Sequence, residues 1–147
     1  EFFDRRISAE DVVALAPDIL AAVKTPSPAD TMFGNEIRMG GFKALTKYRF
    51  KEGIEAGVNF AKTQGGHGSE NRTGEIMKEI AGYGAAAKPF IPALQELIDM
   101  FNNQVKQREY PGGELNQRRV GAVEDAIKSI NAATTQPEMK SIPATTR

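Results

Sequence analysis

Five basic side chains lie close together between Ile37 and Lys51, in a stretch that contains no acidic residue. Lys43 and Lys47 are four residues apart and therefore share one face of a helix. Positive charge concentrated in this way can attract a phosphate, an acidic peptide or a polyanionic glycan. We predict a weak anion-binding or nucleic-acid-binding patch here; in the alternative interpretation, the lysine stems only cover apolar surface. The candidate residues are Arg38, Lys43, Lys47, Arg49 and Lys51.

The residues needed for a catalytic or metal site are scarce. The chain has one histidine, His67, and no cysteine, so a zinc or copper site would need carboxylates for nearly every ligand. His67 stands in the glycine-rich stretch 65–68, and its connection to Ser69 is too short and flexible to hold a nucleophile against its base. The same glycines lack the spacing of a phosphate-binding loop. We expect no catalytic residue, no metal site and no cofactor.

Two pairs of carboxylates have the spacing of neighbours on a helix surface, Glu75 with Glu79 and Glu96 with Asp99. We interpret both pairs as parts of outward, solvated helix faces. Together with the missing catalytic groups, this predicts that the chain by itself is not an enzyme.

The composition narrows the class of protein further. The chain has 147 residues, 40% of them hydrophobic, which suits a single domain with a real core. It carries 19 basic and 19 acidic residues, and this balance disfavours an electrostatic grip on nucleic acid by the whole domain. No run approaches the roughly 20 apolar residues that span a bilayer. The absence of cysteine leaves the compartment open, and an exported protein is slightly favoured over a cytoplasmic one. The start of the chain favours a fragment of a larger protein.

The elements that must position these residues are helices. Hydrophobic residues recur at steps of three and four in six segments, which begin near Ser8, Asn35, Phe50, Ser69, Pro89 and Asn116. No segment alternates with a period of two between hairpin turns, so the fold is predicted to be all-α. Pro17 either kinks the first helix or opens a second one. Gly40 and Gly41 are tolerable inside a helix if another backbone packs closely there.

Helical spacing also identifies the residues expected in the core, and Ser8 and Ser69 are expected to cap the first and the fourth helix. The predicted buried stripes are Val12, Ala16, Ile19 and Val23; Ile37, Phe42, Leu45 and Tyr48; Phe50, Ile54, Val58 and Ala61; Ile76, Ile80 and Tyr83; Phe90, Leu94, Leu97, Phe101 and Val105, widened by Ile91 and Ile98; and Val120, Val123, Ile127 and Ile130.

Part of this pattern repeats. The phrase Ile-x-Ala begins at Ile19, Ile54 and Ile91, at separations of 35 and 37 residues, and each occurrence follows another helix. Those preceding helices share a second column, because Tyr48 and Tyr83 are also 35 residues apart. A period in this range within a helical sequence is typical of stacked helix pairs.

From about residue 8 to 132 the pattern resembles the HEAT/armadillo class of α-solenoid repeats, in which antiparallel helix pairs stack and a proline often opens the second helix. The phrases at 37–45 and 83–89 are also similar to HEAT-like regions of large uncharacterised bacterial proteins, often exported ones. The resemblance implies a short right-handed solenoid of about three helix pairs over residues 1–133, with residues 134–147 as a loosely ordered tail. The alternative is an irregular helical bundle.

These observations predict a non-catalytic scaffold or interaction module that packs against another protein or a neighbouring domain of its parent chain. Two alternatives remain open. The first is an accessory domain of a larger enzyme whose catalytic unit lies elsewhere in the parent chain, and the second is the weak anion or nucleic-acid binder described above.

Overall fold

The computed structural model describes residues 8–26, 33–106 and 113–143, and in these ranges the chain is mostly helical. One isolated parallel bridge, between Phe50 and Lys140, is the only β-type pairing among the described residues. The prediction of an all-α fold is confirmed. The helices are α2 (Ala9–Lys24), α3 (Gly34–Lys47), α4 (Glu52–Lys62), α5 (Ser69–Ala81), the 3₁₀ helix η1 (Gly84–Phe90), α6 (Ile91–Lys106) and α7 (Gly113–Ala132).

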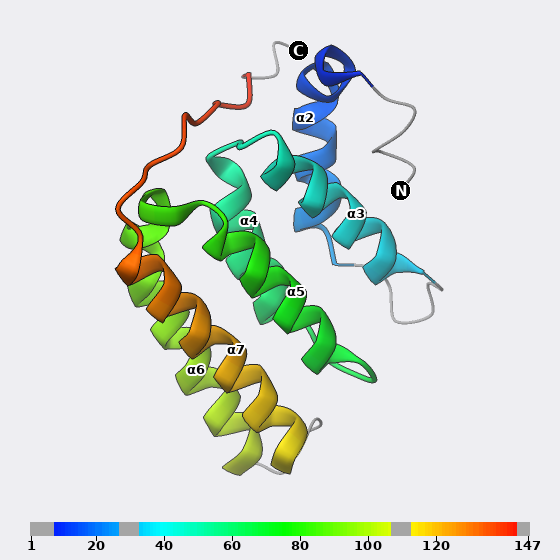
Figure 1. The fold of residues 1–147 in the computed structure, drawn as a ribbon. Coiled ribbons are helices and arrows are strands. Elements are labelled where there is room, and N and C mark those ends of the chain that lie inside the picture. The colour runs from blue at the N-terminus through cyan, green and yellow to red at the C-terminus, as the bar shows by residue number, and fades with distance from the viewer. Residues whose placement is uncertain (1–7, 27–32, 107–112, 144–147) are drawn as a thin grey trace.

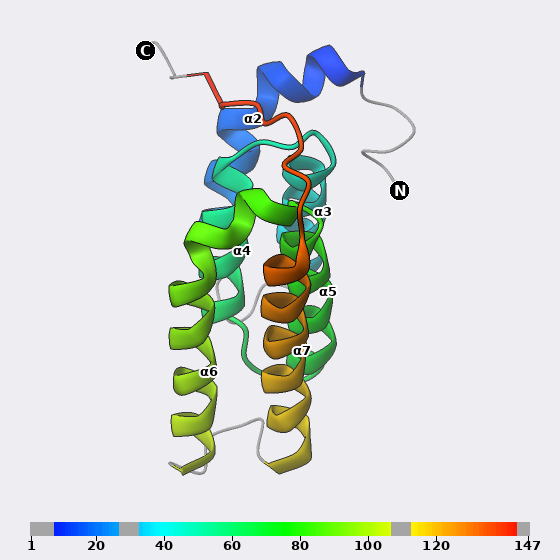
Figure 2. The ribbon, with the colours of Figure 1, turned by 60° about the vertical axis from the view of Figure 1, so that its left-hand side comes forward.

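The helices lie in two layers (Figures 1 and 2). α2, α4 and α6 form one layer, and α3, α5 and α7 form the other. Within the layers, α2 packs against α4 and α4 against α6, and likewise α3 packs against α5 and α5 against α7. Between the layers, each helix packs against a helix that is adjacent to it in the sequence. Successive helices run in opposite directions, so the two helices of one layer that touch are parallel. In the described part of the chain, no helix is both long enough and apolar enough to cross a membrane.

The first helix follows the sequence prediction. Ser8 forms a capping box with Asp11, in which each side chain bonds to the other residue's backbone N–H. The predicted stripe of four residues is buried throughout. Pro17 lies inside α2, and Figure 2 shows that the helix bends along its length. Of the two alternatives for this proline, the structure has the kink.

The stripe predicted for α3 is fully buried only at its two middle positions. Phe42 and Leu45 are fully buried, whereas Ile37 is 64% exposed and Tyr48 is half-buried at the helix end. Ile37 points outward because Arg38, the next residue, takes the inward position with only 4% exposure. One residue turns the side chain by about 100° around a helix.

Glycine allows α2 and α3 to approach each other. A Cβ on Gly41 would lie only 3.0 Å from Cγ2 of Val23 and 3.3 Å from Cγ2 of Ile19, both in α2. The sequence predicts that Gly40 and Gly41 are tolerated inside a helix if another backbone packs closely there, and the structure has this close approach at Gly41.

The predicted cap of α5 is wrong. Gly68, with φ of +74°, precedes the helix, and Ser69 is the first helical residue. The Ser69 hydroxyl is buried without a hydrogen-bond partner. The left-handed glycine starts the helix one residue earlier than expected, which turns Ser69 into the interior. The predicted stripes of α4 and α5 are nevertheless buried as expected.

The predicted start of the fifth helix, which is α6 in the structure, is also wrong in detail. Pro89 lies in the last turn of η1, and α6 begins at Ile91. Leu94, Leu97 and Phe101 are fully buried, but Val105 is 37% exposed. Figures 1 and 2 show that α6 and α7 extend past the ends of α4 and α5, so the last turn of α6 has fewer neighbours to cover it.

In α7, Val123 and Ile130 are buried, and Val120 and Ile127 are half-buried. After α7 the chain continues as an extended segment, residues 133–143, which we call the C-terminal segment. It runs across the ends of the helices, from the end of α7 past η1 to the turn between α3 and α4 (Figure 1).

Candidate functional site

The basic stretch does not form one continuous patch, because its first member is inside the protein. The guanidinium of Arg38 donates from Nε to the carbonyl of Val23 at 2.9 Å and from Nη2 to the hydroxyl of Thr63 at 3.1 Å. Its Cζ lies 4.3 Å from the centre of the Phe60 ring. Burial lowers the pKa of Arg38. This arginine ties α2, α3 and α4 together and is not presented to a partner.

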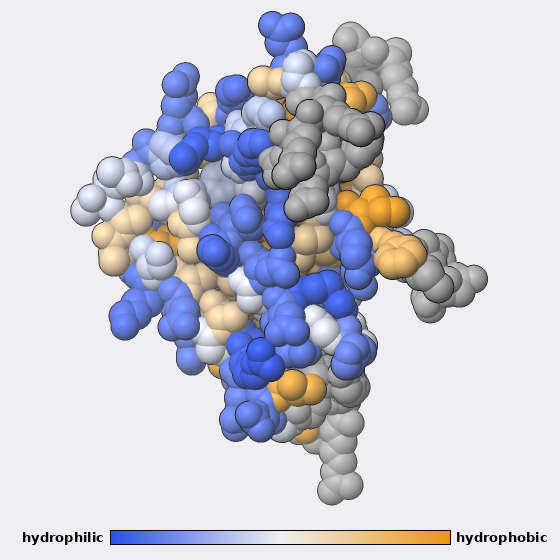
Figure 3. Space-filling view, turned by 45° about the vertical axis from the view of Figure 1, so that its right-hand side comes forward, coloured by the Kyte–Doolittle hydropathy of each residue, from blue (hydrophilic) through white to orange (hydrophobic). Residues whose placement is uncertain are grey.

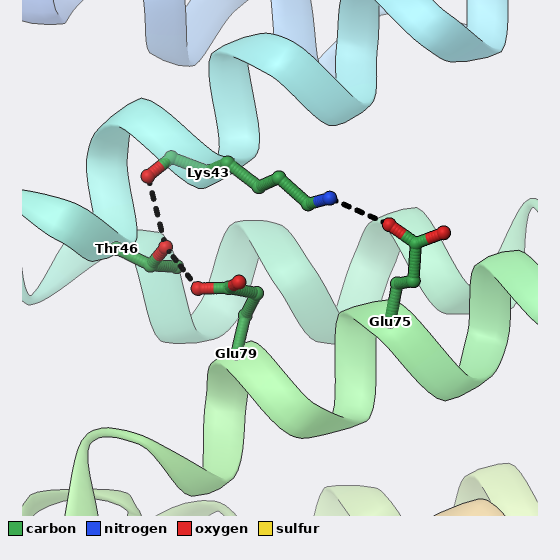
Figure 4. Close-up of polar contacts among 4 residues, drawn as sticks. All are labelled: Lys43, Thr46, Glu75 and Glu79. Carbon is green, nitrogen blue, oxygen red and sulfur yellow. Dashed lines mark hydrogen bonds and ion pairs between the residues drawn. The ribbon is translucent and has the colours of Figure 1, made fainter. Parts of the chain in front are cut away.

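Lys43 is on the surface, but it is already paired. Its Nζ lies 2.6 Å from Oε2 of Glu75 in α5, and both side chains are about half exposed. One turn later in α3, the Thr46 hydroxyl donates to Oε2 of Glu79 at 2.7 Å. Figure 4 shows these two contacts side by side between the helices. The carboxylate pair Glu75/Glu79, which the sequence places on a solvated face, therefore joins two helices of the same layer.

The remaining three basic residues surround the turn between α3 and α4. The Lys47 Nζ lies 5.7 Å from the ring centre of Tyr48. Arg49 has a left-handed backbone with φ of +58°, and its carbonyl accepts from the Lys140 N–H at 2.9 Å. The Lys51 N–H donates to the Lys140 carbonyl, also at 2.9 Å. Of the five predicted residues, three therefore flank this turn, two of them with their backbones bonded to the C-terminal segment, and anion binding there stays a prediction.

The other candidates for chemistry lie apart. His67 is exposed in the loop before α5. Glu96 lies 3.8 Å from Nζ of Lys62, and its side chain is largely exposed. Within the described ranges, no three histidine, aspartate or glutamate side chains come together in a group that could hold a metal ion.

The most buried charge in the described chain was not predicted. Arg119 of α7 is fully buried, with its Cζ 3.7 Å from the ring centre of Phe101 in α6. It donates from Nη2 to the carbonyl of Gln64 at 3.0 Å and from Nη1 to Oε1 of Gln104 at 3.2 Å. Burial lowers its pKa to about 10, and the charge of Glu70 acts in the opposite direction.

A pKa near 10 leaves Arg119 protonated at neutral pH, so a cation holds the loop before α5 against α6 and α7. The sequence contains a signal for this position. Asn116 and Arg119 precede Val123 at helical steps of three and four, and they extend its buried stripe toward the helix start. Arginine is almost never fully buried unless it is paired, so a search for stripes of hydrophobic residues does not include it.

Several buried polar atoms near the starts of α5 and α7 have no hydrogen-bond partner. A hydrogen bond of 3.0 Å between Asn71 and Arg118 fixes the register of α5 and α7 at this end of their interface. Donors and acceptors mixed in this way suit ordered water better than a single anion or cation. The atoms are Ser69 Oγ, Glu70 Oε2, Thr73 Oγ1, Asn116 Oδ1 and Arg119 Nε.

Tyr83 is the buried polar anchor of the α3–α4 turn. Its hydroxyl donates to the carbonyl of Phe50 at 2.8 Å, and the side chain is only 2% exposed. Burial raises its pKa well above the ordinary value, and the charges of Glu79 and Glu52 act in the same direction. The phenol is therefore neutral and serves as a donor, not as a base.

Large exposed hydrophobic side chains occur only at the two ends of the helix stack, as far as the described residues go. Leu15 of α2, together with Phe33 and Ile37 at the start of α3, is 43–65% exposed, and Val105 of α6 is 37% exposed. The face drawn in Figure 3 is mostly hydrophilic, with small groups of hydrophobic side chains, one of them at its right-hand edge. Phe33 also has a left-handed backbone, with φ of +64°, which is costly for a residue other than glycine.

No family model matches this chain, and no curated protein or solved structure is similar enough to give a match.

Proposed function

We propose that this chain is a non-catalytic helical-repeat module that packs against another domain or protein through its first helix pair. The observation that carries the proposal is the position of the exposed apolar residues. Three of the four lie in α2 and at the start of α3, and none lies in α4 or α5. Repeat proteins need polar outer faces on their terminal repeats to remain soluble, and an uncapped end is an interface.

The layered arrangement supports a short α-solenoid, with α2–α3, α4–α5 and α6–α7 as three antiparallel pairs. Each pair packs on the next through both of its helices. The repeated columns occupy similar positions: Leu45 and Ile80 are fully buried, while Tyr48 and Tyr83 lie one and two residues past the ends of α3 and α5. The two tyrosines differ in burial, since Tyr48 is half-buried and Tyr83 is 2% exposed. Ile19 and Ile54 are also buried, and Ile91 is half-buried.

Phe33 gives the partner-facing surface its most specific feature. It is 65% exposed, and Ile37, one turn further along α3, is 64% exposed. Two large apolar side chains at this spacing form a ridge that a complementary protein surface can cover. The left-handed backbone of Phe33 costs free energy, and the exposed side chain does not offset this cost. A partner that buried the Phe33 side chain would offset it.

Site-specific photo-crosslinking tests the proposal. In one variant of the full chain, a benzoyl-substituted phenylalanine replaces Phe33. In the matched control, the same amino acid replaces Lys78, an exposed residue of the α4–α5 pair. Both variants are produced in the cells from which the protein comes. We expect one discrete crosslinked product from position 33 and none from position 78. The same mixture of products at both positions, or no product at position 33, would contradict the proposal.

A further inference from the structure

The C-terminal segment is held largely through its own backbone. At Lys140 both the N–H and the carbonyl are bonded to the turn between α3 and α4. Two residues later, the N–H of Ile142 donates to Oε2 of Glu52 at 3.2 Å. Nearer its start, the carbonyl of Thr135 accepts from the N–H of Ala85 at 3.0 Å. Backbone groups are the same in every residue, so these contacts fit any extended peptide and do not require this particular sequence.

Two side chains anchor the segment, and both are incompletely buried. Met139 and Ile142, three residues apart, pack against the core. No residue between 133 and 143 is fully buried, and most of them are exposed. A segment with few buried apolar contacts and exposed hydrogen bonds opens at much lower free energy than the core beneath it.

The C-terminal segment leaves an open groove beside it. Beside Met139 there is a groove of about 450 Å³ between α4 and η1. Ile54 and Phe90 line it with apolar surface, and its charged border consists of Glu52, Glu55 and Lys51, which leaves it net negative. The groove therefore offers an apolar cavity, an acidic edge and the backbone groups of the neighbouring turn, which are the features of sites that recognise extended peptides.

We propose that this groove and the adjoining turn between α3 and α4 bind an extended segment of a partner protein, and that the C-terminal segment, which forms one wall of the groove, covers this site as a displaceable internal ligand. The partner segment has hydrophobic residues three positions apart, like Met139 and Ile142, and pairs through its backbone with Arg49 and Lys51. The acidic edge favours a basic residue between the two anchors, as Lys140 is here. The site uses residues other than those of the first helix pair, so the two proposals stand or fall separately.

The test uses the full chain and a fluorescently labelled synthetic peptide that copies residues 133–143. In one protein variant, Met139→Ser and Ile142→Ser together weaken the internal ligand. We expect fluorescence anisotropy to show at least tenfold tighter peptide binding to this variant than to the unchanged chain, because the internal competitor no longer holds the groove. A peptide that carries the same two substitutions should bind neither protein.

A matched pair at Lys51 tests the backbone contact. The Lys51 φ of −60° suits proline, so Lys51→Pro removes the N–H that bonds to the segment, whereas Lys51→Ala keeps it. Placed in the weakened variant, Lys51→Pro should lower peptide affinity about fivefold, as expected for one hydrogen bond. Lys51→Ala should leave the affinity unchanged. Equal affinities in the two variants would overturn the assigned binding mode.

Hydrogen exchange on the unchanged chain gives an answer that does not depend on any variant folding. We expect the amides of Lys51 and Ala85, which bond to the segment, to exchange at least 100-fold faster than the amide of Val58 inside α4. Equal protection of all three would mean that the segment leaves only on global unfolding, and it would overturn the proposal. Dimers of the unchanged chain that require Met139 and Ile142 would also overturn it, because the occupant would then be a second copy.

Discussion

Gly57 offers the sharpest test of how the layers pack. A Cβ at this position in α4 would lie 2.6 Å from Cε2 and 2.7 Å from Cζ of Phe42, and 3.1 Å from Cδ1 of Ile80. Carbon atoms in contact normally stand about 3.5–4.0 Å apart. Phe42 is fully buried and meets the edge of the Phe60 ring at a centroid distance of 6.2 Å, so it has little room to move. Gly57→Ala therefore forces a shift between α3, α4 and α5.

The control is Gly74→Ala, at an interior position of α5 where an added Cβ would meet no atom within 4 Å. Alanine gains about 1 kcal/mol over glycine in either helix interior. Since this gain is common to both variants, the difference between them isolates the cost of overpacking at Gly57, about 1–3 kcal/mol.

Urea unfolding followed by circular dichroism measures this difference directly. Gly74→Ala should be more stable than the unchanged chain, and Gly57→Ala should be less stable than Gly74→Ala by the amount given above. Adding Phe42→Leu to Gly57→Ala should recover part of the loss, because the ring atoms that the new Cβ meets are removed. If Gly57→Ala were as stable as Gly74→Ala, the contact of Gly57 with Phe42 and Ile80, and the layer packing built on it, would be wrong.

Three further predictions concern single contacts. Tyr83→Phe should lower the free energy of unfolding by about 1 kcal/mol at neutral pH. Because burial raises the folded-state pKa of Tyr83 above the ordinary 10.0, the stabilisation by the tyrosine is complete below pH 10 and is lost above it. The unfolding free energies of the two proteins should therefore converge between pH 8 and pH 11, and a difference independent of pH would contradict the reasoning. Leu94→Ala should lower the free energy of unfolding by about 2–5 kcal/mol. The control Gln95→Ala, on the exposed side of α6, should be nearly neutral. A loss below about 1 kcal/mol in Leu94→Ala would refute the core position of Leu94. In a double-mutant cycle, Lys43→Ala and Glu75→Ala should show a coupling energy of about 0–1 kcal/mol, and this energy should fall at high salt. A larger coupling energy would mean that the ion pair is buried more deeply than its half-exposed side chains indicate.

Spacing predicted most of the core, because an apolar stripe at helical period has one stable arrangement, facing another helix. The stripes of α2, α4 and α5 are buried as predicted. The errors fall where a polar or terminal residue changes the pattern. Arg38 takes the inward position in place of Ile37, and Val105 lies in the last turn of α6, which together with α7 extends past α4 and α5.

The candidate site was predicted less well than the fold. The basic stretch has charge density along the sequence, but whether Arg38 faces inward or outward depends on partners from α2 and α4. In the same way, the partner of Lys43 comes from 32 residues further along the chain. Electrostatic contacts between distant segments leave no local periodicity, so the sequence pattern contains no signal for them.

The sequence by itself determined that the chain is helical, where its helices approximately lie and which faces are apolar, because these depend on propensity and spacing within a few residues. Only the tertiary structure decided which charges remain on the surface, that Arg119 is buried against Phe101, and that the C-terminal segment forms one wall of the groove beside α4. The physical reason is range: helix formation and amphipathicity are local, whereas the burial of a charge and the seating of an extended segment depend on groups that come together only after the layers pack.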